Sequence, residues 1–324
     1  MNSNYQSTVH NNCGSALTMQ GELEAARDEF EAALREDPVN ATALTNLGYV
    51  LSREGKLDDA IALYENAIRL NPSYAVAHNN LGLAYWEKGQ VHEACEEYLC
   101  AISSDPNYTV PYLNLAQLYH QQGKKAEAME AYERYLALKP DDAQALYNLG
   151  VLWLEKGKPD NAASFFRQVI HLDQGHADAR INLGAILVSK QQWDQAIEML
   201  LPIIEKNPDN LLARYHLALC RLGKGDLQQA ATELESILSR DQASLQAANN
   251  LALIYREMGQ PEKAVQLLVA CLEKHPANTT LHYNLGLVYA GIGRKDEAAS
   301  HFNRVVELEP EGSKRREMAQ KALA

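Results

Sequence analysis

Asparagine is the residue whose placement most clearly suggests binding chemistry in this chain. It recurs at multiples of 34 residues, at Asn12, Asn46, Asn80, Asn114, Asn148, Asn182, Asn250 and Asn284, and only His216 interrupts the series. A side-chain amide carries both a hydrogen-bond donor and an acceptor. The backbone of an extended peptide presents the same two groups at regular intervals. This series, the Asn ladder, therefore predicts capture of a peptide through its main chain.

Residues that could perform catalysis do not form a recognisable motif. The chain contains no HExxH, no GxSxG and no P-loop, and its ten histidines are scattered. Its five cysteines form no CxxC pair, which indicates reduced thiols rather than a disulfide framework. We therefore expect no catalytic residues, no cofactor and no metal site, and we interpret the chain as a protein that is not an enzyme.

The overall charge and hydropathy restrict the classes of partner. The net charge is −12, which argues against binding to nucleic acid. No window contains 18 consecutive apolar residues, and the first twenty residues lack the basic start and apolar run of a secretory signal. These features predict a cytoplasmic protein without direct membrane insertion.

Small residues and prolines share the period of the Asn ladder. Alanine recurs every 34 residues from Ala26 to Ala298, and proline follows the same register from Pro38 to Pro310 with two interruptions. The period divides the chain into an N-terminal extension (1–6), nine units (7–312) and a C-terminal segment (313–324). We expect the last segment to be a capping helix with Met318, Ala319, Ala322 and Leu323 against the final unit and Lys314, Arg315 and Arg316 in water.

Each unit is expected to contain two helices. In the unit 75–108 the pattern is His78, Leu81, Gly82 and Tyr85 on the first helix, Gly89 at the turn, Ala94, Tyr98 and Ala101 on the second helix, and Pro106 at its end. This pattern resembles the tetratricopeptide repeat family over about 94% of the chain. The resemblance implies an all-α fold, a right-handed superhelical solenoid of antiparallel helix pairs, in which the nine units form one continuous array.

The resemblance also implies where a partner would bind. Helical geometry turns the ladder away from the core of its own unit, and in the family this side lines the concave groove. An asparagine ladder of this kind is similar to that of the O-linked N-acetylglucosamine transferase repeat array, whose catalytic domain has no counterpart here. The predicted peptide-binding residues are the ladder members Asn46, Asn80, Asn114, Asn148, Asn182, Asn250 and Asn284 with the aromatic residues Tyr49, Trp86, Tyr147, Tyr215 and Tyr283.

Other interpretations remain open at this level. The ladder could instead join neighbouring repeats, and Trp86 could pack between adjacent first helices. Gln191, Arg221 and His216 depart from the pattern, which is compatible with a local kink, a special binding feature or neutral drift. We interpret the chain as an interaction scaffold that binds an extended or helical segment of one or more proteins. The alternatives are a substrate-targeting subunit of a separate enzyme and a self-assembling scaffold, a homo-oligomer.

Overall fold

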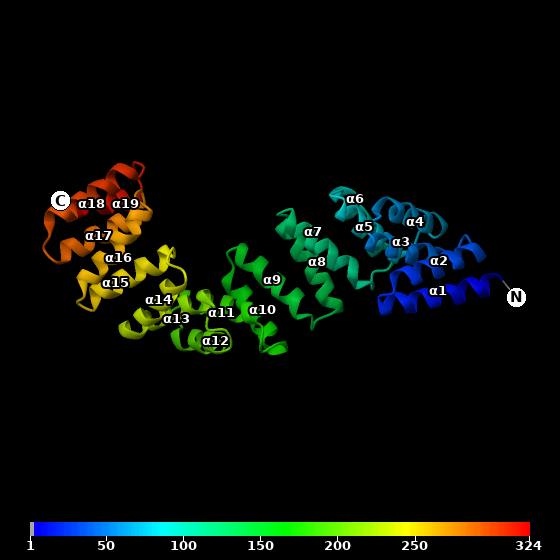
Figure 1. Ribbon diagram of the computed structural model, residues 1–324, viewed down its shortest axis with the longest axis horizontal. Coiled ribbons are helices and arrows are strands. Elements are labelled where there is room, and N and C mark those ends of the chain that lie inside the picture. Colours follow the sequence, from blue (N-terminus) through cyan, green and yellow to red (C-terminus); the bar gives the residue numbers. More distant parts are fainter. Residues whose placement is uncertain (1–2) are drawn as a thin grey trace. The chain divides into compact units, whose positions relative to one another are not determined.

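The computed structural model describes residues 3–324, which form nineteen α-helices and no strand (Figure 1). The chain divides into two compact units, Met1–Phe165 and Phe166–Ala324. Unit 1 contains α1 (Ser3–Gln20), α2 (Leu23–Glu36), α3 (Ala41–Arg53), α4 (Leu57–Leu70), α5 (Ala75–Glu87), α6 (Val91–Ser104), α7 (Thr109–Gln121), α8 (Lys125–Leu138) and α9 (Ala143–Glu155). The boundary falls within α10 (Pro159–Leu172). Unit 2 continues with α11 (Ala177–Ser189), α12 (Trp193–Lys206), α13 (Leu211–Gly223), α14 (Leu227–Arg240), α15 (Leu245–Glu257), α16 (Pro261–Lys274), α17 (Thr279–Gly291), α18 (Lys295–Leu308) and α19 (Lys314–Leu323).

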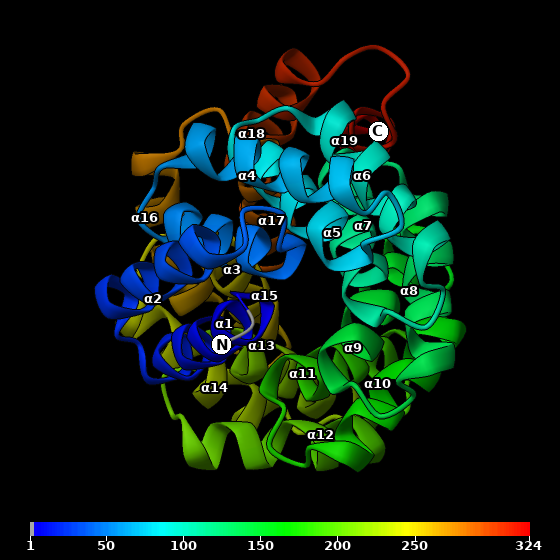
Figure 2. The ribbon, with the colours of Figure 1, turned by 90° about the vertical axis from the view of Figure 1, so that its right-hand side faces the viewer.

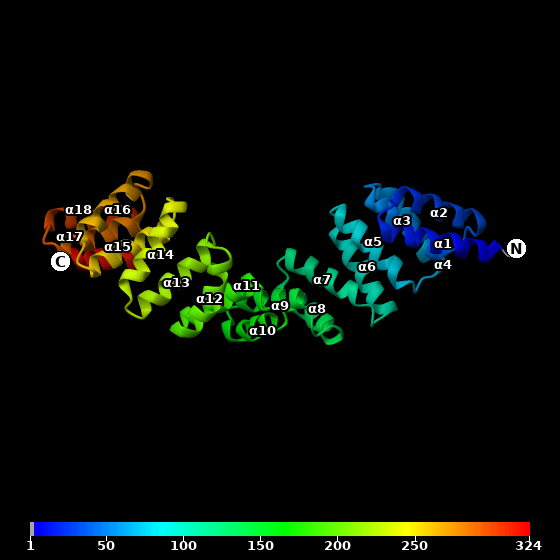
Figure 3. The same ribbon diagram turned by 60° about the horizontal axis from the view of Figure 1, so that its bottom comes forward.

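Within each unit, consecutive helices pack against one another (Figure 3). The turn inside a repeat is short because its glycine adopts a left-handed conformation that other residues resist. At Gly89, for example, φ is 77°, and the amides of Gly89 and Gln90 donate to the carbonyl groups of Trp86 and Tyr85. Gln191 takes the same left-handed conformation with φ of 58°, and its turn keeps the equivalent bonds to Val188 and Leu187. The departure at Gln191 therefore preserves the turn rather than kinking it.

The core of a repeat depends on a small residue facing a ring. Tyr98 on α6 is fully buried and lies against Gly82 on α5, where an added Cβ would come within 2.8 Å of the ring. Gly48 and Tyr64 repeat this pairing in the preceding repeat, with a corresponding distance of 2.7 Å. A glycine at this place therefore allows the first helix to pack directly on the large side chain of the second helix.

The two ends of the described chain are helical. α1 begins at Ser3, so residues 3–6 belong to the helix that opens the first repeat. α19 packs against α18, but the prediction for its contacts was partly wrong: Ala319 is fully buried, whereas Met318, Ala322 and Leu323 are exposed.

The basic residues of α19 also differ from the prediction. Only Lys314 is exposed, whereas Arg315 donates to Glu309 Oε1 (3.0 Å) and Arg316 donates to the Glu309 carbonyl group (3.0 Å). These two bonds attach α19 through its charged side chains as well as its apolar face. Within residues 3–324, no helix has both the length and the apolar character needed to span a bilayer.

Candidate functional site

The ladder asparagines lie on the first helices of successive repeats. In unit 1 they are Asn12, Asn46, Asn80, Asn114 and Asn148, on α1, α3, α5, α7 and α9, and we call the side that carries them the ladder face of unit 1. Asn12 is exposed and the other four are half-buried. In unit 2, Asn182 and Asn250 are half-buried, whereas Asn284 is only 8% exposed. The ladder asparagines of unit 1 are therefore more exposed to solvent than those of unit 2.

Several ladder residues donate a hydrogen bond to the preceding repeat. The acceptor is the side chain 35 residues earlier: Asn46 Nδ2 to Asn11 Oδ1 (3.0 Å), Asn114 Nδ2 to Asn79 Oδ1 (2.9 Å), Asn250 Nδ2 to Tyr215 Oη (3.0 Å) and Asn284 Nδ2 to Asn249 Oδ1 (2.8 Å). These bonds cross from one first helix to the next. The ladder thus joins neighbouring repeats, which was the alternative that the sequence left open.

Part of the hydrogen-bonding capacity of the ladder face is nevertheless unused. The amide of Asn80 accepts from Asn79 Nδ2 (3.3 Å), but its own Nδ2 has no acceptor among residues 3–324. Asn46 and Asn114 donate to the preceding repeat, and within the described chain their Oδ1 atoms receive no hydrogen bond. An approaching peptide would therefore meet a free donor at Asn80 and free acceptors on either side of it.

A polar hollow lies at the far end of this face. It has a volume of about 310 Å³ and is lined by Gln117, His120 and Gln121 of α7, Tyr132 of α8 and Asn148 of α9. On the same first helix, Leu113 occupies the place where Asn11 and Asn79 accept a ladder bond. Since leucine offers no acceptor, the amide of Asn148 donates instead to Tyr132 Oη (3.1 Å).

The electrostatics of the hollow favour neutral polar groups. Burial raises the pKa of Tyr132, against a smaller opposing effect of the Asn148 hydrogen bond, so the hydroxyl group is protonated at neutral pH. At the rim, Glu155 lies 2.9 Å from Lys125 Nζ and 3.6 Å from His120 Nε2. The bond from Lys125, supported by His120, lowers the pKa of Glu155. The charges at the rim are thus paired with one another, and the interior presents amide, hydroxyl and imidazole groups.

Trp86 connects this hollow to the middle of the ladder. Its Nε1 donates to Gln121 Oε1 (3.1 Å), and its half-buried ring packs with Leu115 and Leu118. α5 and α7, which carry these residues, contact each other (Figure 2). Trp86 therefore packs between adjacent first helices, which was the alternative to peptide binding for this residue. Part of its ring stays accessible.

The other predicted aromatic residues are half-buried as well. Tyr49 Oη accepts from Arg53 Nη1 (3.1 Å) on the same helix. Tyr215 receives the ladder bond of Asn250, and the Tyr283 ring lies 5.7 Å from that of Phe302 in the core of unit 2. Tyr147 is also half-buried. Tyr215 and Tyr283 thus have structural contacts of their own, and their role in binding stays a prediction.

Sequence reasoning missed most of the hollow. Gln117, His120 and Gln121 lie on the helix face that was searched, but only asparagine and aromatic residues were selected there. Tyr132 stands at the place of Tyr98 in the repeat, a core position, and it is only 1% exposed. The sequence signal that could have indicated the hollow is the presence of Leu113 and the three polar residues of α7 on one face of the same helix.

The seventh repeat contains an ion network where aromatic and apolar residues are usual. Arg221 occupies the place of a buried tyrosine and lies 3.2 Å from Glu233 Oε1, while Arg214 Nη1 lies 2.6 Å from Glu233 Oε2. Burial lowers the pKa of His216, which is half-buried beside Tyr215. Arg221 is thus engaged within its own repeat. Among residues 3–324, no group of three or more His, Cys, Asp or Glu side chains is arranged to hold a metal ion.

The repeats match models of a known family. A tetratricopeptide repeat model matches residues 14–64, 113–179 and 249–313, which together exceed half of the chain. Further tetratricopeptide repeat models match 73–141, 154–219 and 212–244, and a TPR repeat model matches 53–89. The chain belongs to the tetratricopeptide repeat family. Proteins of this family are generally non-catalytic scaffolds, and the prediction of an all-α helical-repeat solenoid is confirmed.

Solved structures of the family resemble the chain in fold. YrrB, described as a TPR protein with an unusual peptide-binding site, is 29% identical, with a TM-score of 0.50 over 57% of this chain and 95% of its own. PilF of Pseudomonas aeruginosa is 20% identical, with a TM-score of 0.58 over 66% of this chain and 97% of its own. The C-terminal part of a TPR repeat-containing protein from Cytophaga hutchinsonii is 17% identical, with a TM-score of 0.60 over 73% and 97%. No curated protein sequence matches the chain. The repeats and these structures support a role as a protein–protein interaction scaffold.

Proposed function

We propose that this tetratricopeptide repeat protein is a non-catalytic scaffold that binds an extended or helical peptide segment of a partner protein on the ladder face of unit 1. The observation that carries the proposal is the polar hollow of Gln117, His120, Gln121, Tyr132 and Asn148, with the free amide groups of the neighbouring rungs. Amide, hydroxyl and imidazole side chains gathered in one hollow can donate to and accept from a peptide main chain. A site for an acidic peptide tail would need lysine or arginine side chains to bind its carboxylates. The first helices of the nine units carry no lysine or arginine at their second, fifth or sixth position, on the side of the ladder.

Main-chain contacts alone would give weak binding. Each neutral hydrogen bond contributes roughly 0.5–1.5 kcal/mol net, and ordering a flexible peptide consumes much of the sum. The accessible part of Trp86, next to Gln121, supplies the apolar contact that affinity requires. The bound segment should therefore place an aromatic or aliphatic side chain near Trp86 and its main chain near the hollow.

Similarity to a peptide-binding relative supports the proposal. YrrB, a TPR protein with an unusual peptide-binding site, is 29% identical to the part of this chain that it matches. The comparison supports the class of ligand, a peptide, and leaves the sequence of the peptide to experiment.

The proposal can be tested with a pair of variants on the same helix. In Gln117→Ala/Gln121→Ala, two amides of the hollow are removed while all the ladder bonds between repeats stay intact. Gln122→Ala removes an exposed amide that does not line the hollow. Proteins retained from a native lysate are identified by mass spectrometry, and their binding segments are synthesised and titrated against each variant.

We expect the double variant to lose at least about tenfold in affinity for the synthesised segments, equal to about 1.4 kcal/mol, whereas Gln122→Ala binds like the parent. Unchanged binding by the double variant, with an unchanged thermal melt, would show that the partner does not use the hollow.

A further inference from the structure

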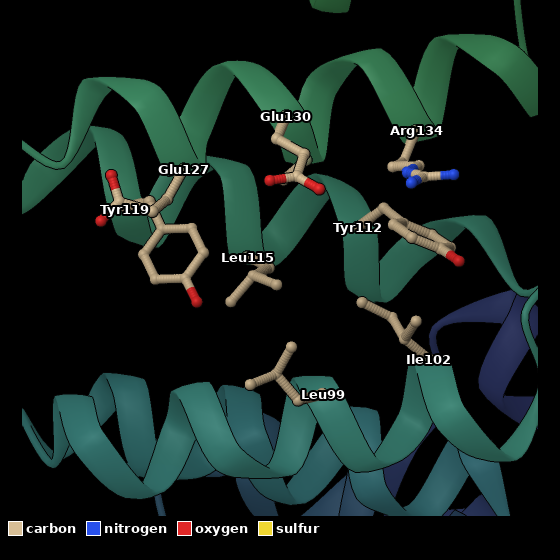
Figure 4. Close-up of a pocket in the computed structure, with 9 residues that line it drawn as sticks. Leu99, Ile102, Tyr112, Leu115, Tyr119, Glu127, Glu130 and Arg134 are labelled. Atoms are coloured by element: carbon tan, nitrogen blue, oxygen red, sulfur yellow. The ribbon is translucent and has the colours of Figure 1, made fainter.

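A second hollow lies between the second helices of unit 1, formed by different residues from the ladder face. It has a volume of about 390 Å³ and lies between α6 and α8, with α7 at its base (Figure 4). Leu99 and Ile102 of α6 form one wall, and the side chains of α8 form the opposite wall (Figure 4). Leu115 and Tyr119 of α7 lie between the walls. We call this feature the α6–α8 groove.

The groove is wider than its counterparts in later repeats, where hollows of about 250 Å³ are lined by Met199 and by Leu267 at the place of Ala131. Ala131 lines it, at a place in the repeat where every other unit has a larger side chain: Glu29, Leu63, Glu97, Phe165, Met199, Glu233, Leu267 and His301. In the preceding repeat this place is filled, and Glu97 Oε2 lies 2.6 Å from His78 Nδ1. In the groove, Tyr112 stands where His78 does, and its hydroxyl group instead donates to the Pro106 carbonyl group (3.2 Å). The space next to Ala131 is therefore left open.

The walls of the groove differ in character. Leu99 is 47% exposed, and it points toward the opposite wall (Figure 4). On α8, Glu127, Glu130 and Arg134 line the other side, with Arg134 beside Tyr112 (Figure 4). Neither carboxylate forms an ion pair with Arg134 or with any other residue of the part of the chain that the structure describes. Burial, the contact with Cys95 and then these two carboxylates raise the pKa of Tyr119 to about 12. An apolar hollow thus lies beside two carboxylates that lack a partner.

We propose that the α6–α8 groove docks an amphipathic segment of a partner protein, which inserts one bulky apolar side chain against Leu99 and Leu115 and places a lysine or arginine beside Glu127 and Glu130. The charge of the groove selects this occupant. A basic side chain would pair with carboxylates that are otherwise solvated, whereas an acidic segment would be repelled. The two walls are helices, so a third helix can lie between them in the manner of an amphipathic helix in a groove.

The experiment uses a displayed library of random peptides of about twelve residues, long enough for three helical turns. Peptides are selected on the full chain and counter-selected on Ala131→Leu, which narrows the groove with the larger residue that stands at this place as Leu63 in the second repeat. The winners are synthesised and titrated against the parent, Ala131→Leu, Glu130→Gln and the control Glu133→Gln. Glu133 is exposed on the same helix and does not line the groove.

We expect the selected peptides to share an apolar residue three or four positions from a lysine or arginine, because those positions lie on one helix face. Ala131→Leu should lower their affinity at least about tenfold, and Glu130→Gln about two- to fivefold in low salt. Glu133→Gln should have no effect. If Ala131→Leu melts at a lower temperature than the parent, the variant Leu99→Gln, at an exposed position, is used in its place. Leu99→Gln should lower the affinity for the selected peptides to a similar extent.

Three results would overturn the proposal. One is a selection in which no peptide binds the parent more tightly than it binds Ala131→Leu and Leu99→Gln. Another is a set of winners without basic residues, which would refute the role of Glu127 and Glu130. The third comes from sedimentation of the chain alone: a dimer that Ala131→Leu converts to a monomer would assign the groove to a second copy of this chain. Peptide binding that survives in Gln117→Ala/Gln121→Ala would support a docking site separate from the ladder face.

Discussion

Glu233 lies between two arginines inside the seventh repeat, and removal of its charge should loosen this repeat. Its side chain is 10% exposed, and those of Arg214 and Arg221 are 16% and 21% exposed. Arg214 also donates from Nε to the Pro208 carbonyl group (2.7 Å), which holds it in place. In Glu233→Gln the shape and two hydrogen-bonding groups remain, but two guanidinium groups face each other without the intervening negative charge.

The magnitude follows from the burial of the three side chains. Removal of one partner from a fully buried ion pair costs about 3–5 kcal/mol. Both arginines retain some contact with water, and the glutamine oxygen still accepts one bond, so we expect about 2–3 kcal/mol of lost stability in this repeat. The effect should be local, because each repeat contacts only its neighbours.

Native-state hydrogen exchange is the suitable assay, since it reports the opening of individual helices. A loss of 2–3 kcal/mol corresponds to amide exchange that is roughly 30- to 160-fold faster in α13 and α14. Amides of unit 1 should exchange at the parent rate. Glu273→Gln, at an exposed position of α16, is the control and should leave α13 and α14 unchanged.

A second variant separates the ion network from simple damage to packing. Ala248, Tyr255 and Leu267 occupy the three corresponding places in the next repeat. The triple change Arg214→Ala, Arg221→Tyr, Glu233→Leu should restore or exceed parent stability, because packed apolar groups often replace buried ions without loss. Exchange in Glu233→Gln within about twofold of the parent, an effect under 0.5 kcal/mol, would refute the reasoning.

Three further predictions concern single contacts. The hydrogen bond that His78 donates to Glu97 outweighs burial and raises the pKa of His78. The stabilisation from this pair is therefore complete below about pH 6.5 and lost as the pH rises through the raised pKa. The urea midpoints of the parent and Glu97→Gln should accordingly differ more at about pH 5.5 than at about pH 8.5, and an equal difference at both would contradict the pairing. Gln191→Gly should raise the thermal stability by about 0.5–1 kcal/mol, because glycine adopts the φ of 58° without strain; a lower melting temperature would argue against strain. Asn284→Ala should cost about 1–2 kcal/mol by leaving the Asn249 acceptor unsatisfied, whereas Asn12→Ala at an exposed place should change stability by less than about 0.5 kcal/mol. Equal effects in urea unfolding would show that the ladder bonds do not stabilise the repeats.

Local features of the fold could be predicted from particular residues. Gly89 predicted the end of the first helix, and α5 ends at Glu87 with Gly89 in the left-handed turn. Pro106 predicted the end of the second helix, and α6 ends at Ser104. These features depend on backbone conformation within one repeat, which is why a single unit of sequence contains the necessary information.

The candidate site could be predicted only in outline. The sequence placed the Asn ladder on one face, but its donors bind residues of the preceding repeat such as Asn11 and Asn79. These acceptors lie one position before the ladder, where helical phase alone does not distinguish an accessible side chain from one in a contact between repeats. At Asn148 the acceptor changes, because Leu113 supplies none and Asn148 donates instead to Tyr132, which lines the hollow.

The sequence by itself determined the period, the helix ends, the family and the order of the small and large core residues, because each of these is encoded within 34 residues of chain. The tertiary structure decided which polar groups remain free to bind. Asn80 retains its donor, Asn114 does not, and Ala131 lines a groove at a place where the eight other repeats carry a larger side chain. Availability is a property of pairs of side chains from different helices, and it depends on distances that packing sets rather than on residue type.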